Sequence, residues 1–417
     1  MPVLTPGNDR TSASSSQPQF IRSYDDTFEV GILIKNNWDG MLWKKDVASG
    51  TYGSLFNLNT IVGNPFNMPV NSVDSHWTLT CVLDTLNNVH VMGNTHATDW
   101  FYAYTNVTNW PPSTTWTVPA FNTLPWNNTG LKLHTYTYFT RMLDGTVIQF
   151  SDQEDSAVDT TAGRDFTAWK LPPGSLTWQP LASNGEFMIT AGNQTLNNGI
   201  PDRAYLYGIA TFILPNGTER LGVVAIWAKR DPADTFLKRN LLYAYTDDLG
   251  ITWKAVDGTV LTMPLDWNNY GPAAITSSPT WSENGSAGFC YDSSGFPHCI
   301  AQNRDISSPM WLELYWNGTA WTSRNVPIQG AGASIGPGIF SLKNELFYVT
   351  TAFNAMRIRN VVTGNQFGIG GPAWNGCKPV PEPVGMRDRS RLSFLIPNGD
   401  SPLVYDVGAN TLPKAPG

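Results

Sequence analysis

Residues 203–253 read RAYLYGIATFILPNGTERLGVVAIWAKRDPADTFLKRNLLYAYTDDLGITW. Two runs rich in β-branched, aliphatic and aromatic residues, 205–214 and 221–228, flank the sequence PNG. Because Asn-Gly favours the tight turns of hairpins, this pattern predicts two antiparallel strands. A third run, 240–253, is rich in Tyr and Trp and predicts an outer strand beside the hairpin. The stretch therefore predicts one antiparallel sheet built on a hairpin.

Similar strand pairs recur along the chain, each around a short turn rich in Gly, Asn or Asp. The other units are 28–57, 76–83 with 89–94, 134–142 with 146–150, 287–291 with 298–303, 339–343 with 346–351, and 392–396 with 402–405. Hairpins at a period of roughly 40–70 residues are typical of propeller blades. We therefore predict an all-β fold, a seven-bladed β-propeller, with no helix of any length.

The propeller is predicted to be a single domain over residues 19–417, preceded by an N-terminal extension at 1–18. The last unit has only two clear strands. We expect the segment 19–24 to supply its missing strand and so close the ring of blades.

One outer turn carries a more specific pattern. Residues 246–253, TDDLGITW, fit the Asp-box sequence S/T-x-D-x-G-x-T-W, which closes the outer hairpin of many propeller blades. We interpret Asp248 as the cap of this turn and Trp253 as a side chain packed between blades. The pattern reports the fold and not the chemistry.

The composition excludes several classes of protein. The 417 residues include 26 Lys and Arg against 33 Asp and Glu, a net charge of −7. An acidic chain without a basic block lacks the electrostatic pattern of a nucleic-acid binder. No apolar run approaches the roughly 18 residues that a membrane span needs, and 41% apolar content can bury a large core. We expect a monomer that binds neither nucleic acid nor membrane.

Glycosylation sequons favour secretion, although the first residues lack the cationic and apolar regions of a signal peptide. The six sequons begin at Asn106, Asn127, Asn193, Asn216, Asn284 and Asn317. Cys290 and Cys299 flank a turn, and a register that pairs 292 with 297 would place them opposite each other at disulfide distance. We predict that this pair is bonded; Cys81 and Cys377 have no such local argument.

Polar residues concentrate where hairpins begin and end. In a propeller blade, the start of the first strand and the end of the second meet at the mouth of the central funnel. First-strand starts supply His76, His134, Tyr136 and Tyr205; second-strand ends supply His96, Asp152, Glu154, Arg230 and Arg304. Each residue alone has a structural interpretation, and Asp152 and Glu154 are interpreted as a solvated loop. The convergence of two His, a Tyr and an Arg from three adjacent blades favours a functional site.

Around these residues the chain resembles the BNR-repeat propeller polysaccharide lyases, which include the ulvan lyases. The similarity spans roughly residues 70–260 and rests on VDSHWTLTCVLDTLNNVHVMGNTHA, HTYTYF with LDGTVIQF, and RAYLYGIA with LGVVAIWAKR. His76 and His96, twenty residues apart, match the two-histidine pattern of the family. Low charge and the sequons make the chain most similar to the fungal L-rhamnose-α-1,4-D-glucuronate lyases that trim gum arabic. The family's Tyr-Pro is Tyr136-Thr137 here.

The resemblance implies β-elimination at a glucuronate joined through O4 to rhamnose, in gum arabic or in ulvan. Such a reaction needs a group that neutralises the carboxylate, a base for the C5 proton and an acid for O4. We assign the carboxylate to Arg230 with His76, and proton transfer to His96 and Tyr205, in either order. We expect the remaining substrate-binding residues to be Tyr136, His134, Trp100 and Arg304. No cofactor or catalytic metal is required, although acidic loops at the rim could hold a structural Ca²⁺.

The alternative is a carbohydrate-binding propeller without catalysis, such as a lectin or a virion fibre head. The fold alone does not distinguish it from a lyase. A sialidase needs three arginines around the substrate carboxylate, and only Arg230 and Arg304 are placed for that role.

Overall fold

The computed structural model describes 20–34, 39–66, 79–93, 96–98, 101–120, 133–154, 164–183, 185, 187–190, 203–230, 236–276, 288–303, 310–327, 338–342, 345–352, 355–370, 380–381, 392–398 and 401–407. The chain forms two compact units, described separately below. The first comprises Met1–Ser151, Trp169–Gln179 and Val380–Asp406; the second comprises Asp152–Ala168, Pro180–Pro379 and Val407–Gly417. Within the described ranges no helix is long and apolar enough to cross a membrane.

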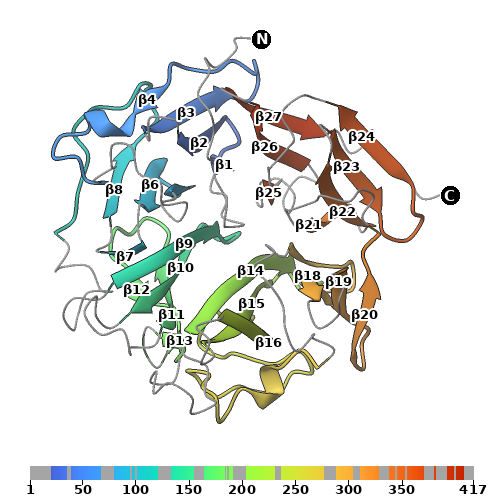
Figure 1. Cartoon of the computed structure of the whole chain (residues 1–417). Coiled ribbons are helices and arrows are strands. Elements are labelled where there is room, and N and C mark those ends of the chain that lie inside the picture. Colours follow the sequence, from blue (N-terminus) through green and yellow to red (C-terminus); the bar gives the residue numbers. More distant parts are fainter. Residues whose placement is uncertain are drawn as a thin grey trace. The chain divides into compact units, whose positions relative to one another are not determined.

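The first unit consists of antiparallel sheets in chain order (Figure 1). One sheet has the order β1-β2-β3-β4, and a second has the order β5-β6-β8. The first-unit strands are β1 (Phe20–Arg22), β2 (Phe28–Ile34), β3 (Gly40–Asp46), β4 (Phe56–Asn57), β5 (Leu79–Leu83), β6 (Asn88–Gly93), β7 (His96–Thr98), β8 (Phe101–Asn106), β9 (Leu133–Arg141), β25 (Val380–Pro381) and β26 (Leu392–Asn398). Four further described strands, β10 (Val147–Glu154), β11 (Arg164–Leu171), β12 (Gln179–Pro180) and β27 (Ser401–Val407), contain residues of both units.

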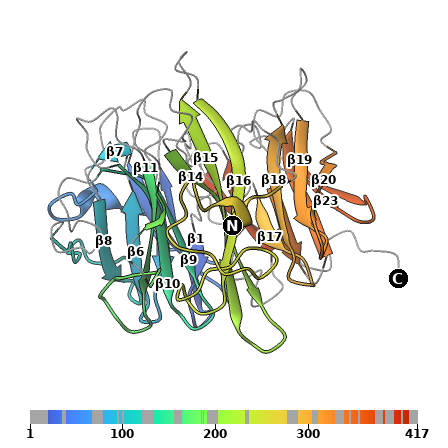
Figure 2. The same cartoon turned by 90° about the horizontal axis from the view of Figure 1, so that it is seen from below.

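The second unit contains the longest strands. β14, β15 and β16 lie side by side in sequence order (Figure 2), followed by sheets of order β17-β18-β19-β20 and β21-β22-β23-β24. Their bounds are β14 (Arg203–Ile213), β15 (Glu219–Arg230), β16 (Phe236–Thr246), β17 (Phe289–Tyr291), β18 (Pro297–Asn303), β19 (Met310–Trp316), β20 (Trp321–Asn325), β21 (Gly338–Leu342), β22 (Glu345–Ala352), β23 (Ala355–Asn360) and β24 (Gln366–Gly370). The short elements of this unit are β13 (Phe187–Ile189) and the 3₁₀ turn η4 (Gly271–Ala273). The 3₁₀ turn η1 (Leu58–Thr60) belongs to the first unit. Each strand pair predicted from the sequence is present.

Four hairpins, β5–β6, β9–β10, β14–β15 and β17–β18, share one turn although their turn sequences differ. In each, the first residue donates its N–H to the carbonyl of the residue four positions later, and the residue before that acceptor has a positive φ. The four turns are 84–88, 142–146, 214–218 and 292–296, with positive φ at Asn87 (61°), Gly145 (91°), Gly217 (84°) and Gly295 (77°). Gly and Asn adopt this left-handed conformation most easily. The shared turn is the structural repeat of the chain.

This turn corrects the predicted disulfide. Because residue 292 pairs with 296 and not with 297, Cys299 lies opposite Phe289, and Cys290 lies opposite His298. Successive side chains of a strand point to opposite faces, so the two cysteines face different hydrophobic clusters. Both are buried free thiols. The prediction of a Cys290–Cys299 bond was wrong by one residue of register.

The first strand also differs from the prediction. β1 pairs with β2, with Phe20 opposite Gly31, and does not complete the last unit. Phe20 and Trp43 pack with ring centroids 5.9 Å apart, and a Cβ at Gly31 would lie 2.2 Å from the Trp43 ring. Glycine at 31 thus lets both rings cover the same sheet. The Asp box is confirmed: Asp248 accepts hydrogen bonds from Thr246 Oγ1 (2.7 Å) and Thr252 N (2.8 Å), and Trp253 is buried.

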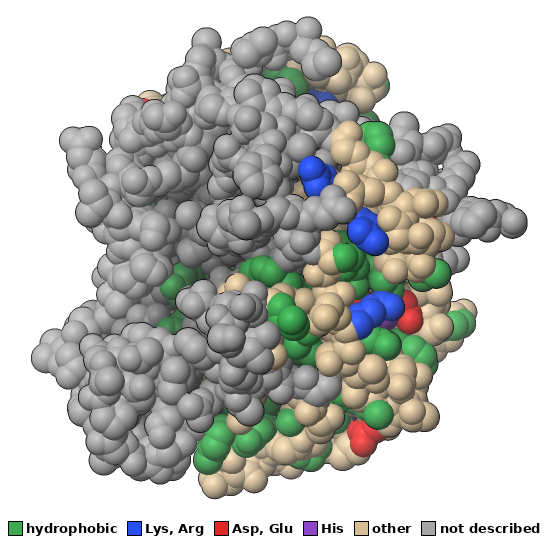
Figure 3. Space-filling model, turned by 45° about the vertical axis from the view of Figure 1, so that its right-hand side comes forward, with side chains coloured by type: hydrophobic (Ala, Val, Ile, Leu, Met, Phe, Trp, Pro, Cys, Tyr) green, Lys and Arg blue, Asp and Glu red, His purple; other side chains and the backbone are tan. Residues whose placement is uncertain are grey.

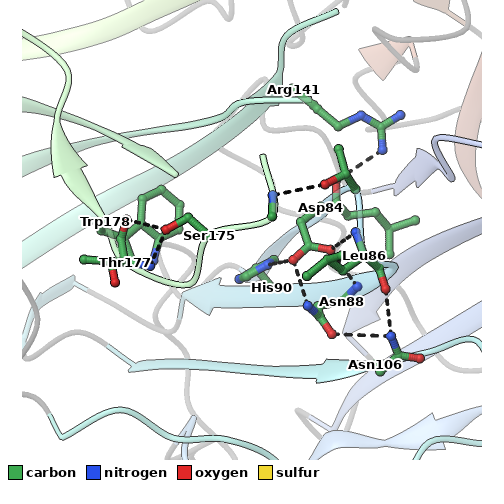
Figure 4. Close-up of polar contacts among 12 residues, drawn as sticks. Asp84, Leu86, Asn88, His90, Asn106, Arg141, Ser175, Thr177 and Trp178 are labelled. Carbon is green, nitrogen blue, oxygen red and sulfur yellow. Dashed lines mark hydrogen bonds and ion pairs between the residues drawn. The ribbon is translucent and has the colours of Figure 1, made fainter. Parts of the chain in front are cut away.

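A buried arginine ties three sheets of the first unit together. Arg141, at the end of β9, is 2% exposed. Its guanidinium donates to the carbonyl of Leu83 at the end of β5 (3.2 Å) and to the carbonyl of Arg22 at the end of β1 (2.9 Å). In Figure 4 the guanidinium points toward the chain at Asp84. The ends of three strands are thereby held by one cation.

We predict that Arg141→Met lowers the free energy of unfolding by about 3 kcal/mol, because two carbonyls lose a charged donor that methionine cannot replace. Chemical denaturation of both proteins measures this difference. The control is Arg359→Met, a half-buried position on β23, where we expect a change under about 0.5 kcal/mol. Equal effects at the two positions would contradict the role of Arg141.

Candidate functional site

Two of the predicted histidines lie on neighbouring strands of the first unit. β7 pairs with β9, with His96 opposite Thr135 and Thr98 opposite His134. The register shifts between these pairs, which is a β-bulge or an irregularity. Strand pairing thus brings the backbones of His96 and His134 within one residue of being directly opposite. Bulges often re-aim side chains next to active sites.

Tyr136, two residues after His134, has an unusual backbone. Its φ is +54°, and its side chain is half-buried. A bulky residue rarely adopts the left-handed region, because its Cβ crowds the backbone there. Such strain persists only where the surrounding structure imposes it, and it clusters at functional sites. The strain supports the choice of Tyr136 as a candidate.

In the second unit, β14 and β15 position the other candidates. Tyr205 lies opposite Ile226, and the register then shifts so that Tyr207 has no single partner in the ladder. Tyr207 is buried in the core, whereas Tyr205 is half-buried. Arg230 is the last residue of β15, opposite Phe236.

Two arginines that the sequence analysis missed lie at the same end of this sheet. Arg203, the first residue of β14, pairs with Ala228, two residues before Arg230. Arg203 also pairs with Arg164 at the start of β11, the parallel contact between these strands. Strand pairing therefore brings the backbones of three arginines to one strand end, where Tyr205 also lies. Arginine binds carboxylate or sulfate groups through charge-assisted hydrogen bonds, so this end of the sheet is a candidate anion site.

β10 extends further than predicted, to Glu154. Asp152 is consequently buried, with 1% exposure, and its interpretation as part of a solvated loop was wrong. Gln149 and Gln153 are buried on the same strand, and neither amide has a hydrogen-bond partner among the described residues. The pairing of β10 with the strands on both sides hides a polar strand from solvent.

The remaining predicted residues lie outside the described part of the chain. His76, Trp100 and Arg304 fall in ranges that the structure does not describe. His96, His134 and Arg230 are described by their backbones alone. Their predicted roles stay predictions.

The other two histidines each hold a hairpin turn through an aspartate, and we call such a pair a turn clamp. His90 Nε2 lies 3.1 Å from Asp84 Oδ2, and His298 Nε2 lies 3.4 Å from Asp292 Oδ2. In both turns the aspartate precedes the histidine by six residues and accepts backbone N–H groups of the turn, and a tyrosine stacks on the imidazole from the next strand. Figure 4 shows the first clamp, with Asp84 between His90 and Asn88. A spacing of six between Asp and His across a turn was the signal available in the sequence.

The second clamp belongs to a buried charged cluster. His298 Nδ1 lies 2.6 Å from Glu313 Oε1, and Arg324 donates to both oxygens of Glu313. Tyr348 donates its hydroxyl to the same carboxylate. Burial alone would lower the pKa of His298, but its bonds to Asp292 and Glu313 outweigh burial and raise the pKa. Burial would raise the pKa of Glu313, yet the bonds from His298 and Arg324 lower it to about 2.

The described residues offer no preassembled cation site. Among them there is no group of three or more His, Cys, Asp or Glu placed to hold a metal. Figure 3 shows one face, on which the described Lys and Arg side chains lie apart, between apolar and uncharged residues. On this face the described side chains form no continuous basic surface of the kind that follows a nucleic-acid backbone.

Comparison with known proteins agrees with the fold. The profile of the BNR repeat-containing family matches residues 57–328. No curated protein sequence matches the chain. Similar solved structures include an ulvan lyase of polysaccharide lyase family PL25 bound to -[GlcA(1-4)Rha3S]-, with a TM-score of 0.63, 12% identity, and coverage of 89% of this chain and 84% of that one.

Two other solved structures bear on the interpretation. The polysaccharide lyase Uly1 has a TM-score of 0.60, 13% identity, and coverage of 94% and 89%. The BP39L lectin of Burkholderia pseudomallei has a TM-score of 0.50, 10% identity, and coverage of 94% and 100%. The predicted fold class, an all-β propeller, is confirmed, and the antiparallel sheets in chain order are consistent with seven blades.

We predict that the His298 cluster makes stability depend on pH in a definite direction. Since the folded pKa of His298 is raised above its ordinary 6.5, its protonated form stabilises the fold below that pH, and the contribution is lost as pH rises through the folded pKa. His298→Gln should therefore lower Tm more at about pH 5.5 than at about pH 9. Thermal melts of both proteins across this range test it. A Tm difference that grows toward high pH would contradict the assignment.

Proposed function

This chain belongs to the BNR repeat-containing family, and from that premise we propose that it is a polysaccharide lyase that cleaves rhamnose-α-1,4-glucuronate linkages by β-elimination. The observation that carries the proposal is that strand pairing brings the backbones of Arg203, Arg230 and Arg164 to one end of β14, β15 and β11, where Tyr205 also lies. Arginine and tyrosine are residue types that suit a reaction in which a uronate carboxylate is bound and a proton moves.

The chemistry explains why these residue types are needed. The C5 proton of a glucuronate becomes acidic only when charge developing on its carboxylate is stabilised. A base then removes this proton, the bond from C4 to the leaving oxygen breaks, and an acid protonates that oxygen. Rhamnose departs with a hydroxyl group on the leaving oxygen, and a double bond forms between C4 and C5 of the uronate. No oxidant, metal or cofactor enters this balance.

Each candidate residue receives one role. We assign the substrate carboxylate to Arg230 with His76, supported by the neighbouring Arg203. A guanidinium can hold both oxygens of a carboxylate at once. Proton transfer is assigned to His96 and Tyr205, whose order as base and acid stays open.

Four further residues are proposed to contact the sugars. The strained backbone of Tyr136 supports a contact that requires a fixed ring. His134, Trp100 and Arg304 complete the set. The solved ulvan lyase bound to -[GlcA(1-4)Rha3S]- supports an acidic polysaccharide of rhamnose and glucuronate as substrate. Gum arabic and ulvan are the two polymers to test.

The similar lectin supports a second candidate, a carbohydrate-binding propeller without catalysis. The two proposals differ in a simple assay. A lyase generates unsaturated uronates that absorb ultraviolet light, whereas a lectin leaves the polymer intact. Incubation of the purified protein with gum arabic and with ulvan, monitored by absorbance, tests the proposed function.

Secretion is also proposed, on the evidence of the sequons. Asn106, Asn216 and Asn317 are exposed, as glycosylation requires. Their side-chain oxygens also accept backbone N–H groups in turns. The free thiols of Cys290 and Cys299 remove the disulfide from this argument.

We predict that His96→Ala reduces kcat by about 10²–10⁴-fold, the contribution of one general acid or base. The fold should persist, because β7 pairs with β9 through backbone groups that alanine retains. Absorbance assays and thermal melts of the variant measure both effects. Turnover close to wild type with an unchanged Tm would remove His96 from the mechanism.

Arg230 and Tyr205 give a second, independent prediction. Arg230→Ala should lower kcat/KM severely, with much of the loss in kcat, because the arginine stabilises charge that grows in the transition state. Arg230→Lys should recover only part, since an ammonium lacks the planar fork. Tyr205→Phe retains the ring and should lose kcat with little change in KM. A purely structural role would instead lower the Tm of Arg230→Ala and leave Tyr205→Phe fully active.

A further inference from the structure

A pair of stacked aromatic rings lies on the loop that follows the Asp box. Trp267 and Tyr270 have ring centroids 4.9 Å apart and an interplanar angle of 23°. Both side chains are half-buried. Trp227 of β15 meets each ring nearly edge-on, at 6.2 Å. The pair is therefore supported from the sheet and partly open to solvent.

Hydrogen bonds within the loop fix the position of the pair. Asp266 Oδ1 accepts from the N–H groups of Asn268 (2.6 Å) and Asn269 (3.0 Å). Asn269 in return accepts from Asp266 N (2.7 Å) and donates to the carbonyls of Thr262 and Pro264. Ile275, just beyond η4, donates its N–H to Leu241 of β16. The loop presents its two rings rigidly, so little conformational entropy is lost when a ligand covers them.

The sheet beneath the loop is distorted at the same place. Asn240 of β16 has a φ of +56°, and the β15–β16 register skips it. Its Nδ2 donates to the Tyr270 hydroxyl at 3.2 Å. Bulges recur beside functional sites, and asparagine is one of the few residues that adopts a positive φ easily. The bulge thus places the Asn240 amide against one of the two half-buried rings.

The rings also lie near the candidate arginines of the same unit. Trp227, which supports both rings, precedes Arg230 by three residues on β15. At about 3.3 Å per residue, these two positions are roughly 10 Å apart along the strand. Successive positions of a strand alternate between faces, so Trp227 and Arg230 belong to opposite faces of β15, and the geometry of the loop itself carries the subsite.

We propose that Trp267 and Tyr270 form a stacking subsite for a neutral pyranose ring of the polysaccharide, beyond the two sugars that react. The identity of the polymer rests on the proposed function; the existence of the subsite rests on the geometry of the loop. Sugar rings have apolar faces of C–H groups, which pack against the electron-rich face of an aromatic ring. Oδ1 of Asp266 accepts two of the loop's own N–H groups, and the negative charge of this carboxylate disfavours a uronate, so the site suits an uncharged sugar.

The test separates an aromatic face from simple packing. Trp267→Leu retains apolar volume against Tyr270 and Trp227 but has no aromatic face, whereas Trp267→Phe retains one. Retardation of the full-length protein in native gels that contain gum arabic or ulvan measures binding without turnover. We expect Trp267→Leu to weaken binding roughly 3- to 10-fold, and Trp267→Phe to restore most of it. The matched control, Trp316→Leu, changes a half-buried tryptophan at the end of β19 and should leave retardation unchanged.

Kinetics provide the second measurement. Trp267→Leu should raise KM for long oligosaccharides by the same factor, with kcat unchanged and with no effect on the shortest cleavable substrate. If the Trp267→Leu protein has an unchanged Tm and is retarded in the gel as strongly as the wild type, the proposal of a subsite is wrong. Equal losses in the Leu and Phe variants, or a wild-type protein that neither polymer retards, would also contradict it. If the wild type is retarded but never cleaves, and Trp267→Leu still weakens binding, the proposed lyase activity fails and the subsite stands.

Discussion

In every antiparallel hairpin, the start of the first strand and the end of the second lie at the same end, opposite the turn. This constraint decides where the polar residues of this chain can contact a substrate. The shared turn at 84–88, 142–146, 214–218 and 292–296 closes the other end of four hairpins. Each of these four hairpins therefore has a turn end, which is structural, and an open end, where side chains are available for chemistry. Tyr205, Arg203 and Arg230 lie at an open end.

The buried charged groups form their hydrogen bonds within the protein and serve structure. Arg141 donates to two backbone carbonyls, and the carboxylate of Glu313 accepts from His298, Arg324 and Tyr348. Removal of one partner from such a cluster leaves another charge or carbonyl buried without compensation, so these groups hold strands in register. They are poor candidates for catalysis, because a group whose bonds are satisfied within the protein has little capacity left for substrate.

Local patterns predicted the strands, and non-local pairing decided what the sequence left open. The hairpin of β14 and β15 was evident from its apolar runs and its Asn-Gly turn. The register at Cys290 was not evident from the sequence, because the left-handed Gly295 makes the turn between β17 and β18 one residue shorter than expected. Arg164 escaped notice because its partner, Arg203, is far away in sequence and on a parallel strand. Asp152 was misplaced because only the neighbouring strands determine how far β10 extends.

The candidate site was predicted to a similar extent. The rule that hairpin ends meet led to His96, His134, Tyr205 and Arg230, and pairing of β7 with β9 brings the first two together. The same rule left out His90 and His298 but did not predict their role, which the aspartates six residues earlier indicate. The strain at Tyr136 has no sequence signature, since it arises from the fold around the residue.

Cleavage in water labelled with heavy oxygen tests the central claim most directly. Elimination breaks the bond between C4 of the glucuronate and its oxygen without adding water, so mass spectrometry should find one C4–C5 double bond per cleavage and no label in the uronate product. A hydrolase would add one water per cleavage, with one labelled oxygen in total, and would leave the uronate saturated. Labelled, saturated products, or intact polymer after prolonged incubation with both gum arabic and ulvan, would contradict the assignment of this protein as a lyase.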